Sequence, residues 1–540
     1  MTVDISILLP AYNAQQYIES SVGSALGQSL ANIEVIVVDD ASTDATAALL
    51  SAMTMADSRL KIISHERNRG PGLSLQTGLE HASGAYCLIM AADDELMPTA
   101  CAQLLAEIQA EPVDILHFDI EFVMSGKHDA VVIEHMSRFL CPPNVTLSGI
   151  EIARSAFEKV EHCWNAAGKL VRTDLCRAAY RRLPNRRLLL GEDLLAYFYI
   201  CYTAESYRGL PEHRYYRYNY GRGNSNWQMV AADSFQQRWL AAFEIVRQIR
   251  DFLDDHHELA RYGSILASIR GHLLVEAMNA VLTLVYPEQR AKAFFSLAKT
   301  WPMPEVVALL AYRCWDEPLA VRKWLFDTGD HDCVPARGDK TACYAFDPNI
   351  LDGACWADLS LRAGSTQEAR PLLLIEGSLD NSHRLPDGFD CRTIQAKYPS
   401  LAAASYGFRC HAIINTFKKY DIGRLVVLNH AQSLIFWDLL LCYCAGIVVE
   451  DAQGNDLTKK LLAREELERV LSTGMVVPGF RQNTNHDFNR ECYGQPWALL
   501  DYRQQAARED ARAQSLSYRL GRALTFPLRQ AVRLFGSHRR

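Results

Sequence analysis

Two adjacent carboxylates, Asp93 and Asp94, follow the apolar run YCLIMAA and stand shortly before Pro98. Carboxylate oxygens are the hard ligands that Mg²⁺ and Mn²⁺ prefer. A divalent cation bound to them would offset the repulsion between the two side chains. The alternative is that Asp93 caps the turn before Pro98 and that Asp94 is solvated.

A second acidic pair, Glu192 and Asp193, follows Gly191 where a loop changes into a predicted helix. A carboxylate in this position, backed by a second acid, can take a proton from an attacking hydroxyl group. The alternative is that both acids only interact with the positive end of the helix dipole, which contributes about 0.3–1 kcal/mol to stability.

Short apolar strands alternate with helices in the part of the chain that must position these pairs. The predicted strands are residues 5–9, 33–38, 61–65, 85–91 and 113–123, and the predicted helices are residues 17–30, 42–56, 73–82 and 150–182. A further helix is predicted to begin near Gly191. This alternation predicts an α/β fold with a doubly wound, mainly parallel sheet.

Polar residues stand at the ends of three predicted strands, and ligands of open α/β sheets bind beside the carboxyl ends of the strands. These residues are Pro10, Ala11, Tyr12 and Asn13 after the first strand, Asp39, Asp40 and Ser42 after the second, and the Asp93–Asp94 pair after the fourth. One such turn would be explained by helix capping. Three of them favour a nucleotide-binding crevice.

A series of sequence blocks resembles the nucleotide-sugar half of the family 2 inverting glycosyltransferases, of the type that builds bacterial surface polysaccharides. The blocks, in the order and spacing of that family over about residues 3–227, are LLPAYNAQQYIESSVGSALGQSLANIEVIVVDDASTDAT, NRGPGLSLQTGLEHASGAY, AADDELMP, WNAAGKLVRTDL, LLLGEDLLAYFY and RYYRYNYGRGNS. The resemblance implies a GT-A-like fold and a transfer of one sugar from a nucleotide-sugar, for which we expect a UDP-sugar.

The resemblance also implies roles for individual residues. It makes Asp193 the general base, with Glu192 positioning the acceptor, and it makes Asp93 a ligand of Mg²⁺ or Mn²⁺ with Asp94 as its helper. Residues expected to bind the donor are Asp39, which would recognise the base, Tyr12, which could stack on it, and the basic Lys169, Arg172 and Arg217 near the diphosphate. Each of the three basic residues could equally be a solvated surface charge, and His213 is a weak candidate for a third metal ligand.

Two positions depart from the family pattern. Ala91 stands where the family usually has the first aspartate of an Asp-x-Asp-Asp motif, which implies weaker metal binding. Leu75 and Gln76 stand where the family often has Arg-Asn, so one expected basic contact is absent.

The composition is that of a globular protein with more than one domain. The 540 residues are too many for one core, 49% are hydrophobic and 22% are charged. The formal charge of −7 gives no reason to expect nucleic-acid binding, and the 15 scattered cysteines suggest reduced thiols rather than a disulfide framework. We expect neither a signal peptide nor a transmembrane segment, and a location in the cytoplasm.

Four parts are predicted along the chain. Residues 1–227 form the glycosyltransferase domain, 228–335 a helical region, 340–500 a second, smaller Rossmann-like α/β domain, and 511–540 a basic tail. Strands are expected at RPLLLIEG, RLVVLNH and GIVVED and a helix at SLIFWDLLLCYCA. This second α/β domain contains no glycine-rich phosphate-binding fingerprint.

The tail carries seven arginines and no acids, so the rest of the chain carries −14. Leu516, Leu520 and Leu524 are spaced at i, i+4 and i+8, which is typical of a basic amphipathic element at a membrane surface. The alternatives are a helix that packs on the acidic body of the protein and a disordered arm. Membrane docking would place the protein on the inner face of the cell membrane, where its acceptor would be a glycan or a lipid-linked oligosaccharide.

Two other functions stay open. One is a bifunctional transferase with a second site in residues 340–500, although no comparable carboxylate pair occurs there. The other is a non-catalytic assembly subunit that keeps the fold, which Ala91 and Leu75 favour and the two acidic pairs oppose. The helical region could shape an acceptor groove or the interface of a homo-oligomer.

Overall fold

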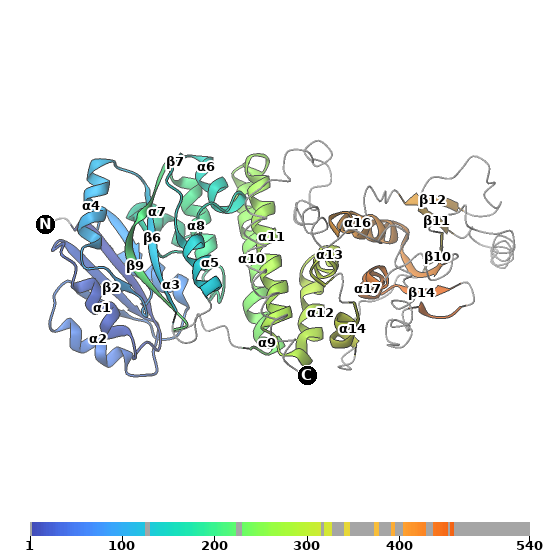
Figure 1. The fold of residues 1–540 in the computed structure, drawn as a ribbon, viewed down its shortest axis with the longest axis horizontal. Helices are drawn as coiled ribbons and strands as arrows, with labels where there is room; N and C mark the ends of the chain where they lie inside the picture. Colours follow the sequence, from blue (N-terminus) through green and yellow to red (C-terminus); the bar gives the residue numbers. More distant parts are fainter. Residues whose placement is uncertain are drawn as a thin grey trace. The chain divides into compact units, whose positions relative to one another are not determined.

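The computed structural model of the chain describes residues 3–124, 130–222, 229–314, 318–326, 340–345, 372–376, 390–394, 403–427, 436–451 and 454–457. These residues form two compact units, whose elements are labelled in Figure 1. The first unit takes its described residues from Met1–Gln228 and Gln237–Arg270, and the second from Met229–Gln236 and Gly271–Gln514. The boundaries predicted near residues 335 and 500, and the tail 511–540, lie outside the described residues.

A mixed sheet forms the centre of the first unit. Its strands are β1 (Ile5–Ala11), β2 (Ile33–Asp39), β3 (Leu60–Ser64), β4 (Tyr86–Ile89), β5 (Glu95–Leu96), β6 (Ile115–Met124), β7 (Thr146–Ser148), β8 (Lys169–Arg172) and β9 (Ser206–Tyr220). The order across the sheet is β3-β2-β1-β4-β8-β6-β9-β5, and β7 pairs with β9. The first four strands in this order are mutually parallel, whereas β8 is antiparallel to both of its neighbours. The predicted α/β fold with a mainly parallel sheet is confirmed.

Helices cover both faces of this sheet (Figure 1). On one face α1 (Ile18–Leu26), α2 (Thr46–Thr54) and α4 (Ala100–Ala110) bury apolar side chains together with alternate residues of β1 and β2. The opposite face carries α3 (Pro71–His81), α7 (Thr173–Tyr180) and α8 (Glu192–Thr203). Strands β1 and β2 are therefore buried on both sides, which explains their long apolar runs.

The helix predicted over residues 150–182 is wrong in its middle part. A short helix α6 (Ile150–Ala153), a π-helical turn (Arg154–Glu158) and α7 are present, but Lys169–Arg172 forms β8 between them. β8 inserts between β4 and β6, whose backbone hydrogen bonds it completes. Four residues are too few to show a strand period, so the pairing that fixes this segment is not visible in its own sequence.

Three further elements complete the first unit. Helix α5 (Ala130–Leu140) packs on β6, and α10 (Ala242–Asp255) packs on α8 through Phe252, whose ring contacts Phe198, Tyr199 and Tyr202. Helix α11 (Leu259–Thr283) begins in this unit and continues into the second. By length and composition α11 could cross a membrane, but more than half of its most apolar stretch is buried in the structure. Buried core helices of soluble proteins can have the same length and composition, so these two properties of α11 do not establish a membrane span.

The second unit contains a parallel sheet of β10 (Lys340–Ala345), β11 (Leu372–Glu376), β12 (Asp390–Ile394), β13 (Ile422–Val427) and β14 (Val448–Asp451). Its order is β12-β11-β10-β13-β14, which is that of doubly wound nucleotide-binding folds. The described helices of this unit are α9 (Ala232–Phe235), α12 (Arg290–Thr300), α13 (Met303–Cys314), α14 (Pro318–Phe326), α16 (Ala403–Tyr420) and α17 (Phe436–Cys444). The three strands and the helix predicted here are confirmed.

Candidate functional site

The carboxyl ends of β2, β1 and β4 lie side by side because these parallel strands are neighbours. The backbone N–H of Asp40 donates to the carbonyl oxygen of Ala11 at 2.8 Å. The N–H of Asn13 donates to Ser42 Oγ at 3.0 Å, which ties the first turn to the second. The structure thus brings the predicted residues at the ends of β1 and β2 together, and Tyr12 among them is 41% exposed.

The adjacent Asp39 and Asp40 are both almost fully buried but have different surroundings. The Asp40 carboxylate accepts a hydrogen bond from the N–H of Gly70 at 2.7 Å and lies 2.7 Å from His65 Nδ1. Asp40 therefore fixes the loop that leads into α3. Asp39 Oδ1 accepts from the N–H of Ser42 at 3.1 Å, and no other bond to this carboxylate is found among the described residues. Of the two, Asp39 keeps acceptor capacity for a ligand.

Asp93 and Asp94 lie in the turn between β4 and β5, and the structure separates their roles. Asp94 is 2% exposed, and its carboxylate accepts hydrogen bonds from the Tyr216 hydroxyl and from the N–H of Asn219, each at 2.7 Å. Burial and the charge of Asp93 raise the pKa of Asp94 to about 7. The Asp93 side chain is only partly buried, and its pKa is raised by burial. Asp93 is thus the member of the pair whose carboxylate can face a ligand.

Arg222 is a basic neighbour of this pair that the sequence reasoning missed. Its guanidinium lies 5.2 Å from the centroid of the Tyr17 ring and 4.0 Å from Glu95 Oε1. Its positive charge opposes the rise in the pKa of Asp93. The block RYYRYNYGRGNS contains Arg222, but only the pairing of β9 with β5, more than a hundred residues earlier, shows that the end of this block lies beside the acidic turn.

The other predicted basic residues are placed differently. Arg172 pairs in register with Tyr86 at the start of β4, because β8 is antiparallel, and its guanidinium binds Asp114 at 3.0 Å. It therefore lies at the opposite edge of the sheet from Asp93, and the structure does not bring it to the site. The guanidinium of Arg217 on β9 binds Glu121 at 2.8 Å, so its charge is largely compensated.

His213 does not join the acidic turn either. It precedes Asn219 by six residues on β9, which corresponds to about 20 Å along an extended strand, and its ring stacks on Tyr215.

The N-terminal end of α8 presents Glu192 and Asp193 next to the start of α3. Gly191 has a φ of +83°, and a Cβ there would lie 2.5 Å from Ile245 of α10. A Cβ on Gly72 would lie 3.2 Å from the Cβ of Glu192. Both glycines thus permit neighbouring helices to approach the acidic pair closely. The hydrogen bond from the N–H of Gly70 to Asp40 links the start of α3 to the end of β2.

The two carboxyls of this pair are coupled by repulsion. Burial and the charge of Asp193 raise the pKa of Glu192 to about 8. Burial also raises the pKa of Asp193, while the N–H of Leu194 and the charge of Lys169 oppose that rise. At neutral pH Glu192 therefore favours its protonated form, whereas the N–H of Leu194 and the charge of Lys169 favour ionisation of Asp193.

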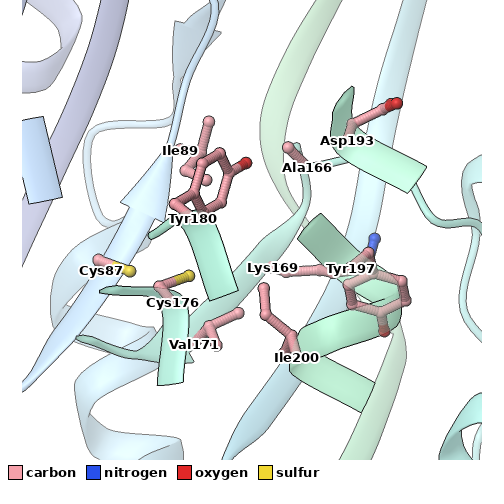
Figure 2. Close-up of a pocket in the computed structure, with 10 residues that line it drawn as sticks. All are labelled: Cys87, Ile89, Ala166, Lys169, Val171, Cys176, Tyr180, Asp193, Tyr197 and Ile200. Atoms are coloured by element: carbon pink, nitrogen blue, oxygen red, sulfur yellow. The ribbon is translucent and has the colours of Figure 1, made fainter. Parts of the chain in front are cut away.

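A small pocket lies beneath Asp193 (Figure 2). It is lined by Cys87, Ile89, Ala166, Lys169, Val171, Cys176, Tyr180, Asp193, Tyr197 and Ile200. The predicted donor ligand Lys169 is 2% exposed and belongs to this pocket. Its Nζ donates to the carbonyl oxygen of Asn165 at 2.5 Å and lies 4.8 Å from the centroid of the Tyr197 ring. Such burial does not suit contact with a diphosphate in solvent.

The acidic turn fits a divalent cation in one specific way. Among the described residues no three His, Cys, Asp or Glu side chains are grouped to hold a metal alone. Mg²⁺ is commonly bound by one or two carboxylates together with substrate phosphates and water. The partly exposed Asp93 can supply that carboxylate, while the hydrogen bonds to Asp94 hold the turn.

Comparison with known proteins shows what the first part of the chain is similar to. The model of the family described as "Glycosyl transferase family 2" matches residues 6–165. The succinoglycan biosynthesis protein ExoO of Rhizobium meliloti is 33% identical over 123 residues, which are 22% of this chain and 35% of that protein. The Escherichia coli protein named UDP-Glc:alpha-D-GlcNAc-diphosphoundecaprenol beta-1,3-glucosyltransferase WfgD is 27% identical over 142 residues, 26% of this chain and 53% of that protein.

The matches to these two relatives span between about a third and about half of their lengths. A crystal structure of residues 1–349 of S. aureus TarS with UDP-GlcNAc aligns over 60% of this chain and 89% of that one, at 23% identity and a TM-score of 0.42. The match to residues 6–165, which include the ends of β1 and β2 and the acidic turn, makes this part of the chain similar to glycosyltransferase family 2.

Proposed function

We propose that this protein is an inverting glycosyltransferase that moves a sugar from a nucleotide-diphosphate sugar to a hydroxyl group of a surface-polysaccharide acceptor. The observation that carries the proposal is the joining of two acidic sites within one unit: the Asp93 turn after β4, and the Glu192–Asp193 pair whose helix packs on α3. One site suits a departing diphosphate and the other suits an attacking hydroxyl.

The donor would lie along the carboxyl ends of β1, β2 and β4. Asp39 can accept a hydrogen bond from a ring N–H of the base, and the exposed ring of Tyr12 can stack on it. A UDP-sugar is the donor class we propose, since the relative WfgD is named for UDP-Glc. Arg222 would contribute positive charge near the diphosphate.

Asp93 would hold the Mg²⁺ or Mn²⁺ ion that accompanies the diphosphate, with Asp94 supporting the turn. When bound, such an ion neutralises the negative charge that develops on the leaving diphosphate. Arg222 would add to this neutralisation, because its charge already acts on Asp93.

The transfer step would be a direct displacement at the anomeric carbon. The acceptor oxygen forms the new bond to this carbon while the bond to the diphosphate oxygen breaks, and the bonding electrons leave with the nucleoside diphosphate. The proton of the acceptor hydroxyl passes to the Asp193 carboxylate. Glu192, which carries the remaining proton of the pair, can donate a hydrogen bond to the acceptor. Inversion follows because attack and departure occur on opposite sides.

The acceptor and the location are proposed from the name of a relative and from the basic tail. A lipid-linked acceptor is supported by the name of WfgD, which includes diphosphoundecaprenol. The basic tail would hold the protein on the inner face of the cell membrane, where such an acceptor is exposed.

The test is metal-dependent release of nucleoside diphosphate from a panel of sugar nucleotides, measured for the wild type and for Asp193→Asn. We expect the substitution to abolish transfer while donor binding and the melting temperature stay nearly unchanged. Asp251→Asn, on the exposed surface of α10, is the matched control and should keep full activity. Absence of release from every donor in the wild type would instead support a non-catalytic assembly subunit, and more than a few per cent of residual activity in Asp193→Asn would remove Asp193 from the role of base.

A further inference from the structure

The amine of Lys169 lies in the interior of the first unit and is directed into the pocket beneath Asp193 rather than toward the ends of β1 and β2. Lys169 begins β8, next to β4, and shares the pocket with Cys87 and Ile89 of β4. In Figure 2 its side chain runs past the Tyr197 ring, and Asp193 lies above this ring, on the side of the pocket away from Cys87. A buried lysine is rare unless something compensates its charge.

The contacts of this amine hold it in place without neutralising it. Its Nζ donates to the carbonyl oxygen of Asn165, lies 3.7 Å from the sulfur of Cys163, and faces the ring of Tyr197. Among the described residues no carboxylate lies within ion-pair distance of Lys169. Its charge therefore acts across the pocket, where apolar walls screen it weakly.

The other ionisable groups around Lys169 stay neutral. The ring of His162 is hydrogen-bonded to Ser155 Oγ at 2.9 Å and to the Tyr197 hydroxyl at 3.0 Å. The ring of His117 is hydrogen-bonded to the Tyr207 hydroxyl at 3.0 Å. Burial and the charge of Lys169 lower the pKa of His162 to about 3 and that of His117 well below its usual value.

Four further ionisable groups near Lys169 are also uncharged. Burial keeps the thiol of Cys201 and the hydroxyls of Tyr180, Tyr197 and Tyr207 protonated, as the raised pKa of each group indicates. Among the described residues that line this pocket, Lys169 is the one basic side chain and Asp193 the one acidic side chain.

The charge of Lys169 acts on one member of the acidic pair. It opposes the rise in the pKa of Asp193, and Asp193 in turn raises the pKa of Lys169, which burial lowers. Of the two acids, Asp193 and not Glu192 lines the pocket that Lys169 shares. A cation on one side of two coupled carboxyls decides which of them ionises first.

We propose that Lys169 is a positioning residue whose buried ammonium group keeps the Asp193 carboxylate, rather than that of Glu192, ionised and ready to accept a proton at neutral pH. This inference rests on the proposed function, since it concerns the base of that reaction. It also gives Lys169 a role other than the contact with the diphosphate that the sequence suggests.

The test compares pH profiles of kcat/KM for nucleoside diphosphate release by the full chain. Lys169→Met and Lys169→Gln remove the charge, and Lys169→Arg keeps it. In Lys169→Met and Lys169→Gln, the neutral variants, we expect the acidic limb of the profile to move up by about one pH unit. At pH below the limb this shift lowers kcat/KM about tenfold, and at high pH kcat/KM recovers. Lys169→Arg should keep the wild-type limb, and so should Lys159→Met, which removes an exposed lysine on the same unit.

The outcomes separate this inference from the proposed function. Activity of the wild type with an unshifted limb in both neutral variants overturns the role of Lys169 alone. A raised KM for the donor with an unshifted limb also overturns it, because it would show that Lys169 contacts the donor. If the neutral variants do not fold, Lys169→Arg decides, since a shifted limb in a variant that keeps the charge contradicts the proposal. A wild type without activity on any donor overturns both.

Discussion

At the scale of single residues, the two members of the acidic turn differ in what they contact, and this difference can be tested. Asp94→Ala would leave the Tyr216 hydroxyl and the N–H of Asn219 without their acceptor. An unsatisfied buried donor costs about 1–3 kcal/mol, so we expect a lower free energy of unfolding in denaturant titrations.

Asp93→Ala removes a partly exposed carboxylate that anchors no part of the fold. We expect its free energy of unfolding to match that of the wild type, while activation by Mg²⁺ or Mn²⁺ is lost. The reverse result, a destabilised Asp93→Ala with normal metal dependence, would exchange the roles of the two residues.

The raised pKa of Glu192 predicts a specific dependence of stability on pH. Its folded-state value of about 8, caused by burial and by Asp193, lies above the ordinary value of 4.5. The protonated form is therefore favoured by folding, so its stabilisation is complete at pH below the ordinary value. It decreases as pH rises and is lost once pH passes about 8.

Glu192→Gln should accordingly show a shallower decrease in stability between about pH 5 and pH 8 than the wild type. Glu66→Gln, on the exposed loop before α3, serves as the control and should keep the wild-type slope. Equal slopes in all three proteins would mean that Glu192 is ionised throughout.

At the scale of elements, β1 to β4, β6 and the helices between the first strands could be predicted from the sequence, whereas β8 and β9 could not. Strands β1 and β2 have long apolar runs because both of their faces are buried. The four-residue β8 has no such run, and the long β9 gains its place only by pairing with β6, β5 and β7. These pairings join residues far apart in the chain, which no local pattern reveals.

The same reasoning explains the site. Side chains that follow parallel strands were predicted together correctly, because the topology brings such ends to one edge. Arg172 on β8 was predicted at the site but lies away from it, and Arg222 after β9 was not predicted at all. The positions of both residues depend on long-range strand pairing.

The close approach of α3 to α8 predicts that Gly72 is sensitive to substitution. A Cβ there would lie 3.2 Å from both the Glu192 Cβ and Leu183 Cδ1, so Gly72→Ala would displace the acidic pair. A displacement of 1 Å at a reacting group can cost about 100-fold in rate, so we expect at least a tenfold loss of kcat for about half that shift.

Gly23→Ala is the matched control, because Gly23 lies inside α1 and a Cβ there meets nothing within 4 Å. It should raise the free energy of unfolding by about 0.5–1 kcal/mol and leave kcat unchanged. A normal kcat in Gly72→Ala would show that α8 can move without loss.

At the scale of the whole molecule, the second unit adds an α/β sheet whose strand order suits a nucleotide. The residues that follow β10 and β13, where a ligand would bind, lie outside the described residues. The strand order alone indicates a fold and not a second activity.

The basic tail is the remaining feature that could determine where the whole protein acts, and its sequence predicts reversible attachment to anionic membranes. Each basic residue near such a surface contributes about 1 kcal/mol, so seven arginines with a leucine stripe are sufficient for docking at low salt. Deleting 511–540 should move the protein from the membrane fraction to the soluble fraction and abolish binding to vesicles that contain phosphatidylglycerol. Salt should weaken the binding of the full chain, because screening shortens the range of the attraction. If the tail packs on the acidic body of the protein instead, the deletion will lower the melting temperature and leave the partitioning unchanged.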